Sequence, residues 1–239
     1  MNKYDAVAFT SAGGQPPNED AVLLIQDENR LVAILADGLG AYCGGEIAST
    51  EVVEALGQIF PHPEPINRQA ISACFTAANR AVIAQQKPGL KMRSTAVMLI
   101  LEEGNTAFAH IGDSRGYAFR DGHIIFQTID HSVSQMAVFR GDITADQIRF
   151  HKSRSQLIRA LGVNDGLLEE ITKLDVFLAG DAFLLCSDGF WEYITEEEMV
   201  EDLLKSQSAE VWLNLMLDRI ESRTPEDNDN LSAIVVICD

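Results

Sequence analysis

The order of strand-like and helical segments constrains the fold of this chain more than any other feature of the sequence. Apolar runs typical of β-strands come first, then two long segments with helical spacing of apolar residues, then a second block of strands. Strands are predicted at 4–10, 21–26, 31–36, 94–101, 106–111, 116–120, 123–127, 182–186 and 231–238, and helices at 45–60, 66–86, 194–204 and 209–220. Because strands and helices come in blocks, an α+β fold with antiparallel sheets is favoured over a doubly wound parallel sheet.

Length and composition narrow the functional classes. The 239 residues fit one domain spanning 1–239, and no internal repeat or low-complexity linker interrupts them. The 18 Lys and Arg against 36 Asp and Glu give a net charge of -18, which disfavours nucleic acid and anionic lipid as partners. The four scattered cysteines form no CxxC pair, and neither a signal peptide nor a membrane span is indicated. We therefore expect reduced thiols and a cytoplasmic protein.

Acidic motifs recur where apolar strands begin or end. They are Asn18-Glu19-Asp20, Ala36-Asp37-Gly38, Gly112-Asp113-Ser114, Ser187-Asp188-Gly189 and Asp229-Asn230. Any one of them alone is adequately explained as a turn or a helix cap. Carboxylates that converge at one edge of a sandwich, however, repel one another unless cations compensate them. Oxygen ligands of this kind suit Mg²⁺ or Mn²⁺ better than zinc, and two such ions can activate water against a phosphate ester.

The same motifs, taken in order, carry a resemblance to a known family. Further segments join them, namely Gly38-Leu39-Gly40, Gly45-Glu46-Ile47-Ala48-Ser49, Ser94-Thr95-Ala96, His110-Ile111-Gly112-Asp113-Ser114-Arg115-Gly116-Tyr117, Asp130-His131-Ser132, Arg159-Ala160-Leu161-Gly162 and Leu184-Leu185-Cys186-Ser187-Asp188-Gly189. Together they span nearly the whole chain, and they resemble the type 2C metal-dependent serine/threonine protein phosphatases, especially the bacterial branch. The resemblance implies two packed antiparallel β-sheets flanked by helices, a four-layer αββα sandwich.

The resemblance also implies roles for individual residues. Asp37 would bridge two metal ions, and the Gly38 carbonyl would serve the second ion. Asp188 and Asp229 would hold the first ion, and Asp113 with Asp188 would hold the third ion known in bacterial members. The implied cofactors are two Mn²⁺ or Mg²⁺ ions, with a third as an extension.

Other residues are implied to support the chemistry. Glu19 and Asp20 would orient metal-bound waters, with Asn230 behind them. The resemblance implies that a metal-activated water attacks phosphoserine or phosphothreonine directly, without a phosphoenzyme. His110 and His131 are interpreted as framework residues.

Two positions depart from the family pattern. Gln15 stands where bacterial relatives usually carry an arginine that binds the substrate phosphate, so weaker phosphate binding is expected. Arg93, beside Ser94 and Thr95, is a candidate substitute. Tyr42 stands where the family usually has a histidine regarded as the general acid, and its reference pKa of about 10 makes it a poorer proton donor.

The leading hypothesis is therefore an enzyme that dephosphorylates a serine/threonine kinase and its targets, acting as a monomer. Gln15 and Tyr42 motivate an alternative, a catalytically weak pseudophosphatase that binds phosphoproteins. A hydrolase of small phosphate esters is a third hypothesis. The basic stretch 134–155, which includes Arg140 and Arg154, matches a flap beside the family's active site. It is interpreted either as a substrate-selecting element or as an ordinary solvated helix and loop.

Overall fold

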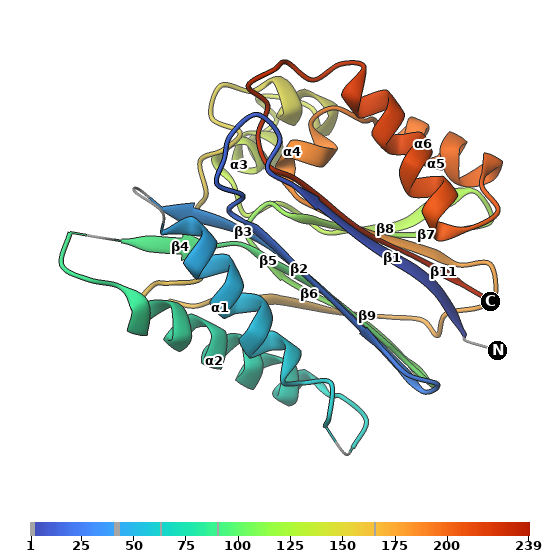
Figure 1. Ribbon diagram of the computed structural model, residues 1–239, viewed down its shortest axis with the longest axis horizontal. Coiled ribbons are helices and arrows are strands. Elements are labelled where there is room, and N and C mark those ends of the chain that lie inside the picture. The colour runs from blue at the N-terminus through green and yellow to red at the C-terminus, as the bar shows by residue number, and fades with distance from the viewer. Residues whose placement is uncertain (1–2, 41–43, 63, 90, 165) are drawn as a thin grey trace.

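Two antiparallel sheets lie face to face in the computed structural model, which describes residues 3–40, 44–62, 64–89, 91–164 and 166–239 (Figure 1). The first sheet has the order β1 (Tyr4–Ser11), β11 (Leu231–Cys238), β10 (Ala182–Cys186), β7 (Arg115–Arg120), β8 (His123–Gln127). The second has the order β2 (Asp20–Gln26), β3 (Arg30–Gly40), β5 (Ala96–Glu102), β6 (Asn105–Ile111), β9 (Glu170–Leu174), with β4 (Met92–Ser94) paired to the end of β3.

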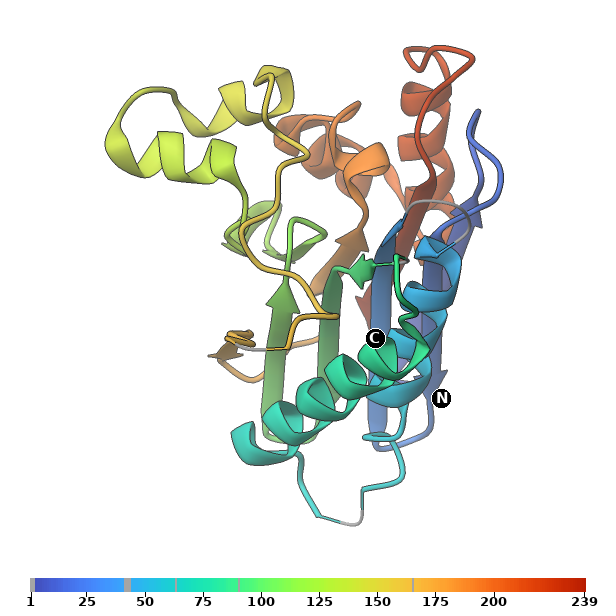
Figure 2. The ribbon, with the colours of Figure 1, turned by 90° about the vertical axis from the view of Figure 1, so that its left-hand side faces the viewer.

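Helices cover both outer faces of the sandwich. The second sheet is covered by α1 (Gly45–Gly57) and α2 (Arg68–Gln85), which run side by side along it (Figure 2). The first sheet is covered by α5 (Glu196–Lys205) and α6 (Ala209–Glu221). Shorter helices, α3 (Val133–Arg140), η1 (Ala145–Phe150) and α4 (Asp188–Trp191), lie together at one end. The predicted four-layer αββα sandwich is confirmed.

Strand β3 shows how the layers are held. Leu31, Ala33 and Leu35 are buried between the two sheets, whereas Val32, Ile34 and Ala36 are buried against α1 and α2. Alternate residues of a strand point to opposite faces, and here both faces are covered. The uninterrupted apolar run in this strand is thereby explained.

Several elements differ from the sequence-based prediction. β3 continues to Gly40, four residues beyond its predicted end, because it pairs there with β4. The strand predicted at 94–101 is divided at Thr95 into β4 and β5. β9 was not predicted, since this half-buried edge strand has no apolar alternation. α4 was not predicted either, because its opening residues look like a turn.

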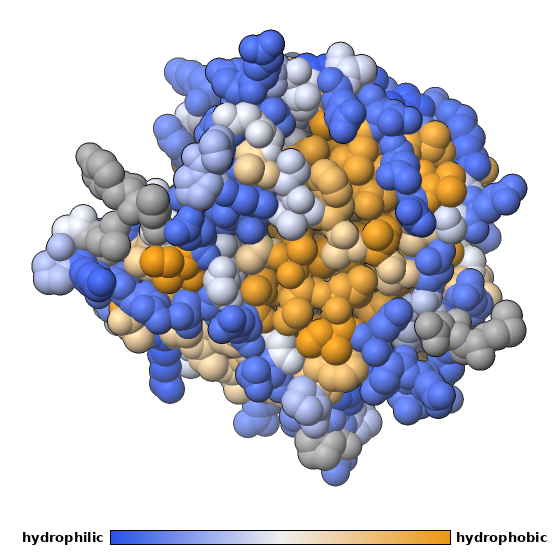
Figure 3. Space-filling model, in the orientation of Figure 1, coloured by the Kyte–Doolittle hydropathy of each residue, from blue (hydrophilic) through white to orange (hydrophobic). Residues whose placement is uncertain are grey.

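The open side of the sandwich carries an apolar face. β1 and β2 are the edge strands of their sheets and lie next to each other there. Residues 21–25 of β2 are all aliphatic and all partly exposed. Figure 3 shows the resulting apolar area at the centre of this face.

Among the helices of the described residues, none combines the length and the apolarity needed to cross a bilayer.

Candidate metal centre

The strand pairing brings the predicted aspartates to one end of the sandwich. Asp20 opens β2 and lies directly opposite Asp37 in β3. Asp113 follows β6 by two residues, Asp188 begins α4 just after β10, and Asp229 precedes β11 by two residues. Four of the five therefore stand within two residues of the end of a strand, as the sequence predicted, whereas Asp37 lies inside β3, three residues before its end.

The carboxyl groups of these aspartates lie close enough together to raise one another's pKa values. Burial raises the pKa of Asp37 well above its ordinary value, and the charges of Asp188, Asp20, Asp113 and Asp229 raise it further. Burial also raises the pKa of Asp188, and Asp113 and Asp229 are the next largest causes. The five aspartates thus form one coupled acidic centre, which we call the aspartate cluster.

Two members of the cluster have pKa values moved close to neutrality. Burial raises the pKa of Asp113 to about 7, with a further rise from the negative charge of Asp130. Burial raises the pKa of Asp20 to about 6, although hydrogen bonds from serine side chains oppose the rise. The Oδ2 atom of Asp20 is buried and has no hydrogen-bond partner in the described part of the chain. Metal-free, the cluster therefore carries an electrostatic cost that bound cations would remove.

The donor set fits hard divalent cations. Every member of the cluster offers carboxylate oxygen, which Mg²⁺ and Mn²⁺ prefer. The aspartates are spaced too widely for a closed cage of protein ligands. Within the described residues, the one group of three such side chains with ligand atoms within 4.8 Å is His110, His131 and Glu170. A wide carboxylate site suits ions that keep several waters in their coordination shell.

The histidine pair is bonded as framework instead of as a metal site. The Nδ1 atom of His131 lies 3.2 Å from the backbone N–H of Gly112. Arg159 places Nη1 3.2 Å from the Nε2 atom of His131, where the arginine charge would oppose a bound cation. The ring of His110 stacks on His131 at 4.7 Å, and its Nε2 is 2.9 Å from the Ile129 carbonyl. Burial lowers the pKa of His131 to about 3, and His110 and Arg159 lower it further.

Hydrogen bonds fix the segment that carries Glu19. The Glu19 N–H donates to Asn230 Oδ1 at 2.8 Å, and its carbonyl accepts the Gly38 N–H at 3.0 Å. Asn230 Nδ2 donates to the carbonyls of Ala12 and Gln15 at 2.9 and 3.0 Å. Asn230 therefore ties the loop before β2 to the start of β11, as expected of a supporting residue.

Glycine at position 38 is required by close packing of the backbone. A Cβ atom there would lie 1.9 Å from the Gly45 carbonyl oxygen, an approach that backbone atoms cannot accommodate. A Cβ atom on Gly45 would in turn lie 2.5 Å from the carboxyl carbon of Glu19. The two glycines let β3, α1 and the Glu19 segment meet beside Asp37.

Sequence reasoning missed the support behind Asp113. The indole Nε1–H of Trp191 donates to the Asp113 carbonyl at 3.0 Å. The guanidinium of Arg115 lies 3.6 Å above the indole ring and makes two hydrogen bonds to Asp130, of 2.9 and 2.8 Å. Arg115 and Asp130 both belong to motifs singled out in the sequence, but only the fold shows that they form a buried pair.

The remaining predicted residues have different surroundings. Gln15 shares a cavity of about 160 Å³ with Asp188 and Asp229, and its side-chain amide donates to the Asp227 carbonyl at 3.0 Å. Arg93 is exposed on β4 opposite Leu39 and does not line this cavity. Tyr42, the predicted general acid, lies outside the described residues.

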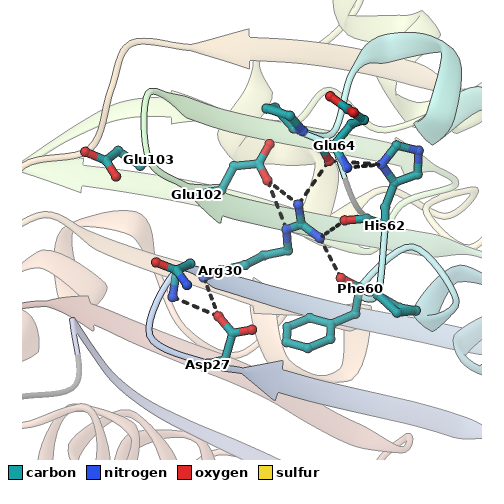
Figure 4. Close-up of a pocket in the computed structure, with 10 residues that line it drawn as sticks. Asp27, Arg30, Phe60, His62, Glu64, Glu102 and Glu103 are labelled. Carbon is teal, nitrogen blue, oxygen red and sulfur yellow. Dashed lines mark hydrogen bonds and ion pairs between the residues drawn. The ribbon is translucent and has the colours of Figure 1, made fainter.

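A larger cavity, of about 480 Å³, lies at the opposite end of β3. Figure 4 shows the Arg30 guanidinium between the Glu102 carboxylate and the carbonyls of Phe60 and His62. Seven residues of strand separate Arg30 from Asp37, roughly 23 Å at 3.3 Å per residue. Because its donors are engaged within the protein, Arg30 is best explained as a clamp on the connection between α1 and α2.

Comparison with known proteins identifies the family of the chain. A sequence model of the protein phosphatase 2C family matches residues 11–233. PstP, a serine/threonine protein phosphatase of Mycobacterium tuberculosis, is 35% identical over 222 residues, covering 91% of this chain and 41% of PstP. The chain thus spans about two fifths of that relative's length. The serine/threonine phosphatase stp of Listeria welshimeri is 30% identical over 210 residues, covering 84% of this chain and 82% of stp.

Solved structures support the same relationship. The crystal structure of the PstP catalytic domain in complex with two manganese ions has a TM-score of 0.83 and 29% identity to this chain. The match covers 98% of this chain and 97% of that structure. The chain belongs to the protein phosphatase 2C family.

Proposed function

We propose that residues 1–239 form one catalytic domain that hydrolyses phosphoserine and phosphothreonine in proteins with the help of Mn²⁺ or Mg²⁺. The observation that carries this proposal is the convergence of Asp20, Asp113, Asp188 and Asp229 on Asp37, in a family of protein phosphatases. Such a cluster is costly without cations and needs no cysteine or phosphoenzyme for its chemistry.

Each residue of the cluster has a proposed task. Asp37 and the Gly38 carbonyl would serve two ions, Asp188 and Asp229 would hold the first, and Asp113 with Asp188 would hold a third. When bound, the cations would supply Lewis-acid activation of water and neutralise charge on the phosphoryl oxygens.

The carboxylates of Glu19 and Asp20 would accept hydrogen bonds from water and so orient it toward the phosphorus. The unpartnered Oδ2 of Asp20 supports this role, because a buried acceptor without a donor is costly unless water or a ligand fills the place. Asn230 keeps the Glu19 segment in position through the Glu19 N–H. At the leaving oxygen, Tyr42 is proposed to act as the proton donor in place of the family's histidine.

The proposed substrates are a serine/threonine kinase and its phosphorylated targets, met in the cytoplasm by a monomeric enzyme. Phosphatase names among the relatives support catalysis, and the pseudophosphatase alternative has no support of that kind. Gln15 and Tyr42 are then variations that tune the activity.

A comparison of substrates tests the proposal. The protein is incubated with a phosphothreonine peptide and, separately, with p-nitrophenyl phosphate, each with Mn²⁺, with Mg²⁺ and with chelator. Metal-dependent release with a higher kcat/KM for the peptide is expected. Rapid hydrolysis of the small ester alone would instead identify a small-molecule phosphatase.

A further inference from the structure

The apolar face on the open side of the sandwich contains an edge strand without the usual protection (Figure 3). Natural edge strands are generally guarded by a charged side chain, a proline, a β-bulge or a covering element, because their unpaired main-chain groups otherwise attract other chains. Residues 21–25 of β2 are Ala-Val-Leu-Leu-Ile, and they pair with β3 without a register shift. All five are partly exposed. This edge therefore has the properties of a surface that another chain covers.

The hydrogen-bonding pattern of β2 follows from its pairing with β3. Alternate residues of an antiparallel pair exchange main-chain hydrogen bonds with the opposite strand, and the residues between them point their N–H and C=O groups away from it. Beside the start of β2, the Glu19 carbonyl accepts the Gly38 N–H at 3.0 Å. Just past its end, the Asp27 N–H donates to the Arg30 carbonyl at 2.9 Å. The odd-numbered residues of β2 therefore bond β3, and the even-numbered residues face outward.

Val22 and Leu24 are the even-numbered residues at the centre of β2. Because β2 is the last strand of its sheet, no described strand lies beyond its outer edge. Among the described residues, no turn or loop bonds the main chain of Val22 or Leu24 either. Their N–H and C=O groups are thus available to pair with an added strand, which is the basis of β-augmentation.

An added strand would also bury apolar side chains of β2. Val22 and Leu24 pack against the core between the two sheets, whereas Leu23 packs against the core beneath α1. Each of the three remains partly exposed, so both faces of the edge offer apolar surface. A segment with an apolar residue at every second position would cover that surface.

The charge around this edge selects the partner. Residues 4–29, which contain β1, β2 and their connection, have no lysine or arginine and carry the carboxylates of Asp5, Glu19, Asp20, Asp27 and Glu28. Helix α1, which contacts β2, has no lysine or arginine either and carries those of Glu46, Glu51 and Glu54. Two copies of the chain paired through β2 would bring like charges together, and each copy has a net charge of -18. A cationic partner is therefore favoured over a second copy.

We propose that the outer edge of β2 is a docking site for an extended segment of a partner protein in which apolar residues alternate with lysine or arginine. The main chain of the segment pairs with Val22 and Leu24, and its cations face the carboxylates of the flanking elements. This inference goes beyond the proposed phosphatase activity, because the paired residues are not part of the aspartate cluster.

Binding of labelled peptides to the wild-type protein, followed by fluorescence anisotropy, tests the proposal. The probe is Lys-Val-Lys-Val-Lys-Val-Lys, and we expect a Kd of about 10–100 μM from a short ladder and buried valines. Lys-Val-Lys-Pro-Lys-Val-Lys keeps the charge but interrupts the strand, and Glu-Val-Glu-Val-Glu-Val-Glu reverses the charge. Each of these controls should bind at least about 10-fold more weakly than the probe.

Two variants of the protein test the site itself. Val22→Pro removes an outward N–H and leaves the odd-numbered hydrogen bonds to β3 in place, so it should weaken probe binding at least about 10-fold. Gln26→Lys combined with Glu28→Lys changes exposed side chains only and serves if Val22→Pro does not fold. This double variant should weaken probe binding about 3- to 10-fold through charge repulsion.

A matched control makes the same change of charge elsewhere. Glu197→Lys combined with Gln207→Lys alters exposed side chains in and just after α5, on the other sheet, and should leave the Kd within about twofold of wild type. Hydrogen exchange with and without the probe then locates the contact, and the amides of residues 20–26 should gain protection.

Several results would overturn the proposal. These are no probe binding at about 1 mM, equal binding of the proline peptide, equal binding by folded Val22→Pro, or protection confined to elements other than β2. Sedimentation velocity of the free protein tests the other occupant. Dimerisation that Val22→Pro abolishes would identify a second copy on this edge and would likewise contradict a cationic partner.

Discussion

Replacing Asp20 with asparagine should stabilise the metal-free protein. Asp20 is buried in the aspartate cluster, where desolvation and the charges of Asp229 and Glu19 raise its pKa from 3.8 to about 6. Its Oδ2 atom has no hydrogen-bond donor among the described residues. Asparagine has nearly the same shape, removes the charge and places an amide N–H₂ group among neighbouring carboxylates. The same change removes an acceptor that the proposed chemistry uses.

The magnitude and the pH dependence follow from the raised pKa. A carboxyl group whose pKa is higher in the folded state favours folding below its unfolded pKa and loses that contribution as the pH rises through its folded pKa. Above pH 6 the metal-free wild type therefore carries the full cost, which is about 3 kcal/mol for a shift of about 2 pKa units. For a chain of this size that corresponds to a rise in Tm of roughly 6–12 °C. At pH 4 the difference should nearly vanish.

Thermal unfolding measures this directly. Wild type and Asp20→Asn are melted in chelator at pH 4, 6 and 8, followed by circular dichroism, and again at pH 8 with Mn²⁺. The variant should melt higher than wild type in chelator at pH 8, and Mn²⁺ should raise the Tm of the wild type more than that of the variant. An Asp20→Asn protein that melts no higher than wild type in chelator at pH 8 would refute the electrostatic account of the cluster.

Three further predictions concern residues that support the fold and the site. Hydrogen bonds from arginine lower the pKa of Glu198 to about 2, so Glu198→Gln should lower the free energy of unfolding in urea at pH 7 by about 1–2 kcal/mol. As the pH falls from 4.5 toward 2, the wild type loses this contribution and the difference between the two proteins should disappear. Gly38→Ala should cost about 3 kcal/mol or prevent folding, because the Gly45 carbonyl occupies the place of the new Cβ, and its yield and Tm will report this. Trp191→Phe should leave the Asp113 carbonyl without its hydrogen-bond donor and lower the free energy of unfolding by about 1–3 kcal/mol. It should also weaken metal activation, measured as the midpoint of Mn²⁺ activation. An unchanged Tm and an unchanged midpoint would contradict that role of Trp191.

Local patterns were sufficient to predict most strands and helices and an α+β fold with antiparallel sheets, whereas the four-layer arrangement followed from the family resemblance. Alternating or continuous apolar runs marked nearly every strand, and helical spacing marked α1, α2, α5 and α6. β9 lacked such a signal because it is an edge strand whose residues are partly solvated. α4 opens with Asp188 and Gly189, which are turn-forming residues, and its helical conformation depends on burial of Phe190 and Trp191. Tertiary packing decided these two cases.

The carboxylates of the site were predictable for a similar reason. Strand ends converge in a sandwich, so acidic residues at those positions indicated a shared centre before any coordinates. The supporting contacts were not predictable, because Trp191 reaches Asp113 across 78 positions of sequence. Arg154 was singled out only as part of a basic stretch. Its place beside Gln15 depends on how the segment after η1 packs against α4.

Phosphate release from a phosphothreonine peptide by Asp188→Asn, beside the wild type, tests the central claim most directly. Both proteins are first shown to be folded by circular dichroism, and each is assayed with Mn²⁺, with Mg²⁺ and with chelator. The account predicts release by the wild type that requires metal, stops with chelator and returns with added Mn²⁺, and near-complete loss in the variant. Release by Asp188→Asn equal to that of the wild type, or none from folded wild type with either metal, would contradict it.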